Sequence, residues 1–145
     1  MIQYSIARKE HLPGILSLYK QLQPDEKPLA MDEADKIWEK GNQQGITYFV
    51  ATDGDRVIST LYLVIMPNMT RGGRSNGLIE NVVTHEEYRR KGIGKKLLQM
   101  AIDYAKAKNC YKIVLFSNIK RKEAHLFYEN CGFDGNSRRV FEMRF

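Results

Sequence analysis

A stretch of glycines and basic residues near the middle of the chain has the chemistry of an anion-binding site. It contains Arg89, Arg90, Lys91, Gly92, Ile93, Gly94 and Lys95. An apolar strand precedes it and an amphipathic helix follows, so the two glycines fall at a helix start. The first amides of a helix have no internal partner and carry partial positive charge. The glycines let an anion approach those amides and the basic side chains add charge, which predicts a phosphate or pyrophosphate site.

Two other phosphate-binding motifs do not fit this stretch. A Walker A loop requires a glycine where Arg89 stands and Ser or Thr where Lys96 stands. A dinucleotide-binding fingerprint requires a third glycine where Leu97 stands. A glycine-rich turn with incidental surface charge remains the structural alternative.

The elements that position this stretch follow from hydrophobic periodicity. Strands are predicted at Gln3–Arg8, Ile46–Thr52, Val57–Ile65, Leu78–Thr84, Tyr111–Phe116 and Val140–Phe145, with an extra short strand at Phe133. Helices are predicted at Leu12–Leu22, at Met31–Lys40 ended by Gly41, from Ile93 to Tyr104, and at Glu123–Asn130 closed by Gly132. This order predicts one α/β (α+β) domain over residues 1–145, with a mixed, mostly antiparallel sheet flanked by helices.

Composition limits the class of protein and its surroundings. At 145 residues the chain suits one globular domain, and no apolar run approaches the ~20 residues of a membrane span. The two cysteines lack metal-ligand spacing, so we expect reduced thiols, no metal and a cytoplasmic location. The net charge is +6, but no nucleic-acid-binding motif accompanies the basic clusters, so we expect no nucleic-acid partner.

Two motifs at a characteristic separation resemble those of GNAT acetyltransferases. Arg89-x-x-Gly92-x-Gly94 resembles the family signature Q/R-x-x-G-x-G/A. The stretch from Ala124 to Phe133 is similar to the second coenzyme-contacting helix of the family, with its A-x-x-F-Y-x-x-x-G-F pattern. Either motif alone would be weak evidence, whereas the pair is specific.

The resemblance implies an acetyl-CoA site where a β-bulge splays two parallel strands, here Leu78–Thr84 and Tyr111–Phe116. Backbone groups of Val82, Val83 and Thr84 would bind the thioester carbonyl and pantetheine. Amides from Arg90 to Lys95, including Lys91, Gly92, Ile93 and Gly94, would bind the pyrophosphate beside Arg89. Asn118, Arg121, Phe127 and Tyr128 would line the pantetheine and adenosine side. Arg121 stands where many members carry Asn, and Asn118 is the candidate replacement.

Two residues are candidates for catalysis. Strand alternation places Glu80 on one face with Leu78 and Val82, where a carboxylate is costly to bury without a purpose or a partner. Ile79-Glu80-Asn81 resembles a family stretch whose acid lies near the acceptor, so Glu80 is a candidate base, with a paired structural Glu as the alternative. Tyr128 matches the family tyrosine that contacts the sulfur, with a core aromatic as the alternative.

The resemblance therefore implies an N-acetyltransferase that uses acetyl-CoA and acts by direct attack in a ternary complex. A small-molecule amine is favoured over a protein amine as the acceptor, and the family suggests a homodimer. A CoA-binding sensor without turnover is the alternative, although the retention of Glu80 and Tyr128 argues against it.

Overall fold

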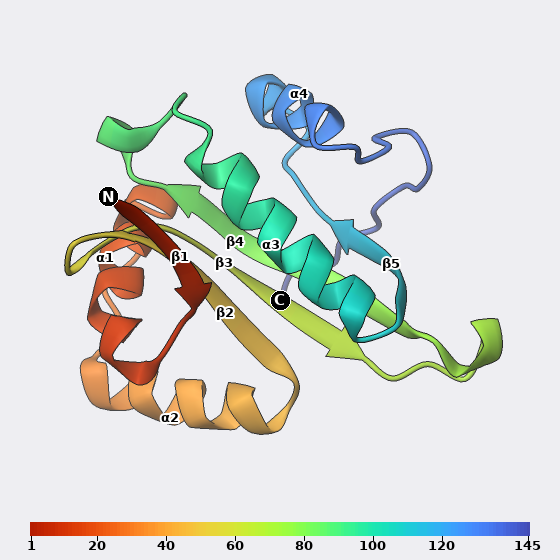
Figure 1. Cartoon of the computed structure of the whole chain (residues 1–145), viewed down its shortest axis with the longest axis horizontal. Coiled ribbons are helices and arrows are strands. Elements are labelled where there is room, and N and C mark those ends of the chain that lie inside the picture. Colours follow the sequence, from red (N-terminus) through yellow and green to blue (C-terminus); the bar gives the residue numbers. More distant parts are fainter. The chain divides into compact units, whose positions relative to one another are not determined.

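Five strands make one mixed sheet in the computed structural model, which describes all residues from Met1 to Phe145 (Figure 1). They are β1 (Ile2–Ile6), β2 (Ile46–Asp53), β3 (Arg56–Met66), β4 (Ser75–Thr84) and β5 (Cys110–Leu115). The order in the sheet is β1-β2-β3-β4-β5, with antiparallel pairs from β1 to β4 and β5 parallel to β4. Neighbouring strands are therefore consecutive in the chain.

The helices follow the predicted apolar faces. They are α1 (Leu12–Leu22), α2 (Met31–Gln43), α3 (Ile93–Ala107) and α4 (Lys122–Asn130), with short 3₁₀ turns η1 (Lys9–His11), η2 (Arg71–Gly73) and η3 (Glu86–Tyr88). The predicted C-terminal signal of α4 is confirmed. Gly132 has φ 96°, its N–H donates to the Glu129 carbonyl at 3.0 Å, and the Phe133 N–H donates to the Tyr128 carbonyl at 3.1 Å. These two bonds form a Schellman motif, which the left-handed glycine makes possible.

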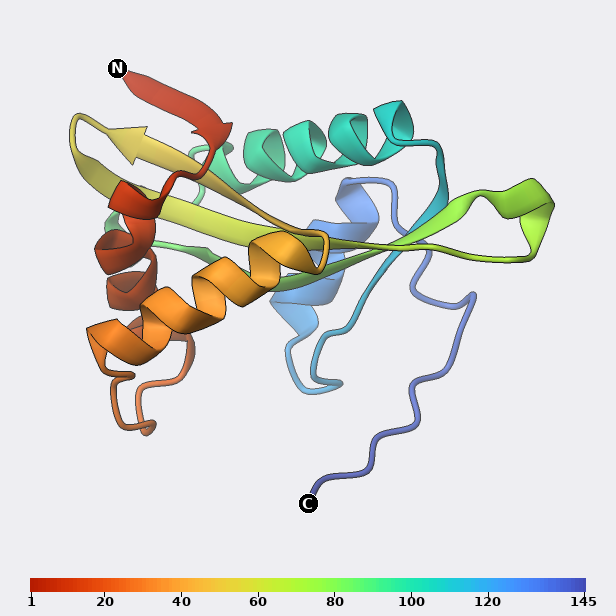
Figure 2. The same ribbon diagram turned by 90° about the horizontal axis from the view of Figure 1, so that it is seen from below.

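The chain divides into an N-terminal unit, Met1–Val114, and a C-terminal unit, Leu115–Phe145, and each is described by itself. In the N-terminal unit α3 covers one face of the sheet, and α1 and α2 cover the other (Figure 2). The α1–α2 side contains a buried cluster of Ala7, Leu12, Ile15, Leu18, Ala34, Trp38, Val50, Val57 and Val83. A single domain over residues 1–145 stays a prediction.

The predicted end of the second helix is wrong. The helix does not stop before Gly41 but continues to Gln43. Gly41 is buried inside it, facing Ile46, whose side chain would lie 3.5 Å from an added Cβ. The reversal is made instead by Gly45, which has φ 77°. A helical glycine can serve close packing as well as helix termination, and the sequence pattern does not separate the two uses.

The strand predicted at Val140–Phe145 is also wrong, and no strand forms at Phe133. Phe141, Met143 and Phe145 alternate with polar residues, yet they are 88%, 79% and 113% exposed. Alternation describes which side of a strand is apolar, but a strand also needs a neighbour to accept its backbone hydrogen bonds. These residues pair with no strand in the structure.

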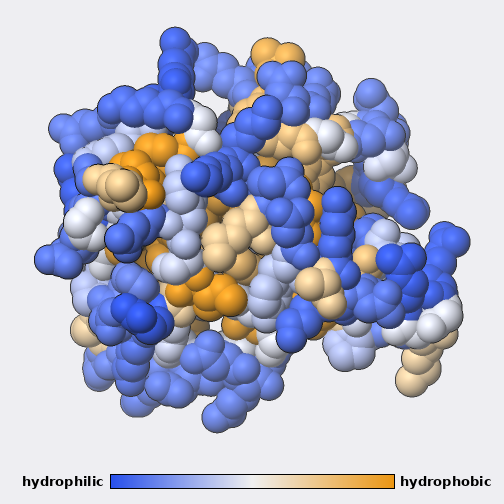
Figure 3. Space-filling view, in the orientation of Figure 1, coloured by the Kyte–Doolittle hydropathy of each residue, from blue (hydrophilic) through white to orange (hydrophobic).

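The outer surface of the α3 side is mostly hydrophilic, with hydrophobic patches between the polar side chains (Figure 3). Exposed polar residues of α3 include Lys95, Lys96, Gln99 and Asp103. No helix of the chain has the length and apolar character that a membrane span requires.

Candidate active site

A β-bulge interrupts β4, one of the two strands for which the family resemblance implied it. Thr60 of β3 pairs with Val83, and Tyr62 pairs with Glu80, so Leu61 alone faces two residues of β4, Asn81 and Val82. Asn81 has φ 51°, in the left-handed region that asparagine tolerates better than most residues. A bulge leaves its extra residue outside the regular ladder, which frees backbone groups for other partners.

The bulge corrects the predicted alternation of side chains along β4. A regular strand would place Glu80 and Val83 on opposite faces. Instead Val83 pairs with Thr60, two residues from the partner of Glu80, so the two side chains lie on the same face. Val83 is 6% exposed and belongs to the cluster beneath α1 and α2. Glu80 therefore lies on the α1–α2 side of the sheet.

We expect the bulge to depend on the residue at position 81. Asn81→Gly keeps access to positive φ, whereas Asn81→Val puts a β-branched residue there and should cost about 1–3 kcal/mol of stability. The measurement is the free energy of unfolding by denaturant. Asn76→Val on the same strand is the matched control, because Asn76 has no positive φ. Equal stability of Asn81→Val and wild type would show that the bulge does not depend on this side chain.

Glu80 lies at the end of a row of aromatic hydroxyl groups. Tyr48 pairs across the sheet with Tyr62, which pairs with Glu80, and the two tyrosine rings are 5.3 Å apart. Burial raises the pKa of the Glu80 carboxyl, although a hydrogen bond from the Asn81 backbone lowers it. Burial and the nearby Glu80 charge also raise the pKa of Tyr62. No cationic side chain of the N-terminal unit forms an ion pair with Glu80, which argues against a structural salt bridge within that unit.

Tyr19 of α1 brings another hydroxyl toward the bulge. The oxygen is buried and makes no hydrogen bond of full geometry, and burial raises its pKa well above the usual range for tyrosine. The Asn81 side chain lies close enough to lower that pKa in part. A buried hydroxyl without a partner is uncommon in a folded protein and calls for an explanation. Here the Asn81 side chain is a weak partner, and Tyr19 thus places a buried hydroxyl beside the bulge.

The sequence analysis missed the tyrosine row. The Asp53-Gly54-Asp55 turn is typical of a hairpin, but its uninterrupted register would pair Tyr48 with Leu61. The register shift between Ala51 and Thr52 pairs Tyr48 with Tyr62 instead. The pairing of Tyr62 with Glu80 depends on the longer β3–β4 connection, whose register the sequence does not reveal. Both pairings of the row therefore required the structure.

Residues 89–95, here called the glycine turn, lead into the start of α3, as the sequence predicted. Arg90 has φ 59° and Gly92 has φ 75°, and Gly92 is the N-cap of α3. The first helical hydrogen bond runs from the Lys96 N–H to the Gly92 carbonyl at 3.0 Å. The amides of the three residues before Lys96 therefore have no helical partner. An added Cβ at Gly92 would meet no atom within 4 Å, so the space beside this backbone is open.

The predicted site residues in β4 and in the glycine turn contact different neighbouring groups. Arg89 donates from Nε to the Thr84 carbonyl at 3.1 Å, so it closes the loop between β4 and the glycine turn. The Lys91 ammonium lies 5.1 Å from the centre of the Tyr88 ring. Arg90 and Lys95 are exposed. The Val83 carbonyl accepts a hydrogen bond from Ser59 Oγ at 3.2 Å. The structure thus brings Val82–Thr84 and residues 89–95 into one unit, while their contacts with a ligand stay a prediction.

The other predicted site residues belong to the C-terminal unit. Asn118 accepts the Lys120 N–H at its side-chain oxygen, 2.9 Å away, and so stabilises the turn before α4. Arg121 is the N-cap of α4. The rings of Phe127 and Tyr128 are 5.3 Å apart, within a single turn of that helix. The coenzyme-binding and catalytic roles of these four residues stay predictions.

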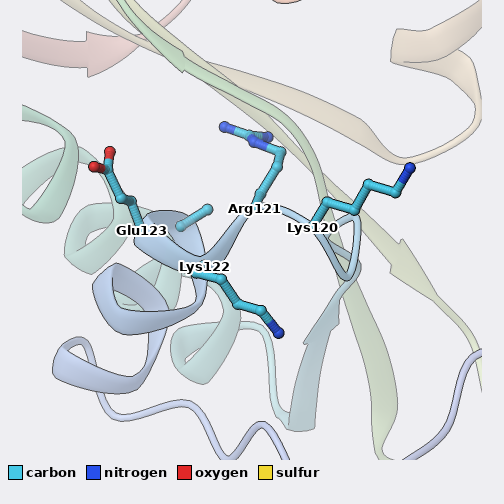
Figure 4. A pocket seen from close by; sticks show the side chains of 5 residues that line it. Lys120, Arg121, Lys122 and Glu123 are labelled. Carbon is cyan, nitrogen blue, oxygen red and sulfur yellow. The ribbon is translucent and has the colours of Figure 1, made fainter.

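A shallow pocket opens at the start of α4. It is lined by Lys120, Arg121, Lys122, Glu123 and Ala124 and has a volume of about 350 Å³. Figure 4 shows the three cationic side chains pointing in different directions from the turn. No group of three or more His, Cys, Asp or Glu side chains in the chain is arranged to hold a metal ion.

Comparison with known proteins identifies the family. The model of the acetyltransferase (GNAT) family matches residues 12–133. A glucosamine 6-phosphate N-acetyltransferase of Trypanosoma brucei brucei is 35% identical over 115 residues, covering 78% of this chain and 76% of the relative. The protein of the same name from Arabidopsis thaliana is 28% identical over 110 residues, covering 73% and 72%. A solved structure of a putative acetyltransferase from Agrobacterium tumefaciens str. C58 covers 99% of both chains with 38% identity and a TM-score of 0.93. The chain therefore belongs to the GNAT family and is an N-acetyltransferase.

Proposed function

We propose that this enzyme transfers the acetyl group of acetyl-CoA to the primary amine of a phosphorylated amino sugar, with glucosamine 6-phosphate as the first candidate. The observation that carries the proposal is Glu80. Its carboxyl has a raised pKa, has no cationic partner in its unit, and lies in a row with two tyrosines beside the bulge. A raised pKa makes a carboxylate a stronger base, which suits a group that must accept a proton from the acceptor.

The donor site proposed for acetyl-CoA fits the N-terminal unit. The glycine turn offers free helix-start amides, and Arg90 and Lys95 are exposed cations beside them, so the turn suits a pyrophosphate. At the bulge, amides outside the regular ladder are suited to stabilise negative charge on the thioester oxygen. The same backbone would then serve both binding and catalysis.

In the proposed reaction Glu80 takes a proton from the acceptor ammonium, directly or through a water molecule. The free amine attacks the thioester carbon in the ternary complex, the new C–N bond forms, and the C–S bond breaks. The amide nitrogen gives up its second proton, and the departing thiolate is protonated. Tyr128 is the proposed donor to the sulfur, because a tyrosine of pKa ~10 is still protonated at the pH where a thiol of pKa ~8.5 is released.

The choice of acceptor rests on the named relatives and on the tyrosine row. Both curated relatives reported above are named as glucosamine 6-phosphate N-acetyltransferases. Tyr48 and Tyr62 are partly exposed and add hydroxyl groups beside Glu80. Hydroxyl groups next to a carboxylate can bind both the hydroxyls and the ammonium of an amino sugar.

The experiment is an amine panel with acetyl-CoA in which release of free thiol is followed. The panel contains glucosamine 6-phosphate, glucosamine, a polyamine, an amino acid and a peptide. We expect the highest kcat/KM for glucosamine 6-phosphate. A preference for the peptide would overturn the small-molecule acceptor. Tight binding of acetyl-CoA with no turnover on any amine would favour the sensor instead.

A homodimer also stays a proposal, which sedimentation velocity can check.

The donor site gives a separate prediction for Gly94. Gly94→Val should raise the dissociation constant of acetyl-CoA at least tenfold, about 1.4 kcal/mol, because a side chain then stands beside the free amides. Gly94 is a better position to test than Gly92, because Gly92 has positive φ and any replacement there is strained. Calorimetry gives the affinity. Gln99→Val in the same helix is the control for β-branching, and unchanged affinity of a folded Gly94→Val would remove the pyrophosphate assignment.

A further inference from the structure

The tip of the β2–β3 hairpin, residues 53–56, contacts the segment that leads into the glycine turn. The Tyr88 hydroxyl donates to Asp53 Oδ2 at 2.8 Å. The Tyr88 ring also packs against the buried cluster of Ala51, Ile58 and Ile93. Because Ile93 is the first residue of α3, one side chain connects the hairpin tip to the start of the helix.

Arg56, the other end residue of the tip, contacts the same segment. Its Nη2 lies 2.8 Å from His85 Nε2, and its Nη1 lies 3.2 Å from Glu87 Oε2. A guanidinium only donates hydrogen bonds, so His85 Nε2 accepts this one. His85 is also the N-cap of η3. Arg56 therefore attaches the tip to η3 at two points.

The Tyr88 ring lies near two cations. The Arg56 guanidinium carbon is 5.7 Å from the ring centre, and the Lys91 ammonium is 5.1 Å from it. Both distances suit an attraction between a cation and the face of an aromatic ring. Lys91 itself lies between the two left-handed residues of the glycine turn, Arg90 and Gly92. The contact thus fixes the turn at its centre.

Glycine adopts positive φ without strain, but a non-glycine residue such as Arg90 persists there only where surrounding contacts hold it. The Arg90 side chain is exposed, so its own packing does not hold the residue in this conformation. The contacts available nearby are those of Tyr88, which links Asp53, Ile93 and Lys91. The geometry of the free amides therefore depends on residues that would not themselves touch a ligand.

We propose that Asp53, Arg56 and Tyr88 form a clamp that holds the glycine turn in the conformation that binds the coenzyme. The three are positioning residues, and their role rests on the proposed binding of acetyl-CoA at that turn. Preorganised amides bind without paying for ordering on contact, so loss of the clamp weakens coenzyme binding. It leaves the chemical step unchanged, because the clamp contacts none of the proposed catalytic groups.

The test uses four variants of the full chain and one control. Tyr88→Phe removes the hydroxyl and keeps the ring, and Asp53→Ala removes its acceptor. Asp53→Asn restores an oxygen acceptor without the charge, and the fourth variant combines Tyr88→Phe with Asp53→Ala. Tyr104→Phe in α3 removes a hydroxyl that lies outside the clamp. For each protein we measure the dissociation constant of CoA by calorimetry, kcat and KM for acetyl-CoA, and the melting temperature.

Loss of the hydrogen bond in Tyr88→Phe should raise the dissociation constant and KM about three- to tenfold with kcat unchanged. Asp53→Ala should raise both constants to the same extent. Asp53→Asn and Tyr104→Phe should bind CoA as tightly as wild type. The double variant should bind CoA no more weakly than either single variant. Hydrogen exchange of the amides at residues 90–95 should speed up in Tyr88→Phe.

Three results would overturn the clamp. They are wild-type affinity of Tyr88→Phe, additive losses in the double variant, and failure of Asp53→Asn to restore binding. A change in melting temperature alone would indicate a merely structural role and also count against it. Failure of the wild-type chain to bind CoA would be a different outcome, because it removes the proposed donor site itself. If the wild-type chain binds CoA and the variants bind it equally well, only the clamp proposal is overturned.

Discussion

Glu80→Gln is expected to lower kcat about 100-fold or more while the affinity for acetyl-CoA holds. The substitution keeps the shape of the side chain and removes its ability to take a proton. The loss should shrink as pH rises, because a larger fraction of the acceptor is then already the free amine. Glu39→Gln, on an exposed position of α2, is the matched control and should leave kcat unchanged.

The pKa of Glu80 sets the pH dependence of the wild-type enzyme. Burial raises this pKa, so the acid limb of kcat/KM should lie above the usual range of a glutamate carboxyl. Activity should rise with pH as the carboxyl ionises, and Glu80→Gln should lack this limb. A pH–rate profile of both proteins, with the same acceptor, measures the difference.

The contribution of Glu80 to the free energy of unfolding should fall as pH rises, whereas the activity should rise. A carboxyl whose pKa is raised by folding favours the native state most below its unfolded pKa, and this contribution is lost as pH rises through the folded pKa. Above its folded pKa the ionised Glu80 therefore opposes folding, and Glu80→Gln should melt there at the same or a higher temperature. A lower melting temperature together with wild-type rates at every pH would show that Glu80 is a paired structural residue.

The glycine turn was predictable from sequence because its features are local. The two glycines, the cations and the following apolar helix all lie within one short segment, and backbone physics alone assigns them to a helix start. The structure places the N-cap at Gly92, between the strand and the helix that were predicted. Local chemistry of this kind survives folding with little change.

The bulge in β4 is a feature that the local sequence pattern does not predict. A period of two along Leu78–Thr84 is correct up to Glu80 and reversed after it, because the bulge at Asn81 and Val82 adds one residue. Nothing in the alternation of side chains announces the extra residue. Asparagine is only a weak indication, since it is common in turns and loops as well. The family resemblance predicted a bulge in this strand, and the pairing of β3 with β4 shows where it lies.

The failed strand at the C-terminus and the extended α2 have related causes. The alternation of Phe141, Met143 and Phe145 concerns that segment alone, whereas a strand forms only where a second strand pairs with it. Gly41 looks like a helix end from its own sequence, but the neighbouring Ile46 occupies the space that a larger side chain would need. In both places the deciding contact is made by residues outside the segment.

Tyr128→Phe is expected to lower kcat and kcat/KM together by about 100-fold or more. The hydroxyl is proposed to donate to the sulfur only as negative charge develops there, so its loss affects the transition state and not the binding of substrate. The change removes one oxygen and little volume. Tyr111→Phe, a tyrosine of β5, is the control for loss of a hydroxyl elsewhere.

The contacts within the C-terminal unit make this a clean test. The Tyr128 ring lies 5.3 Å from that of Phe127 and 6.2 Å from that of Phe133, and phenylalanine can keep both contacts. The backbone bond from Phe133 to the Tyr128 carbonyl does not involve the hydroxyl. If Tyr128 is the acid, turnover should fall by far more than these preserved ring contacts would lead the melting temperature to fall. A core tyrosine would behave in the reverse way, because it would lose stability and keep its rate. Intact kcat with a lowered melting temperature, measured on one preparation, would end the assignment of Tyr128 as the acid.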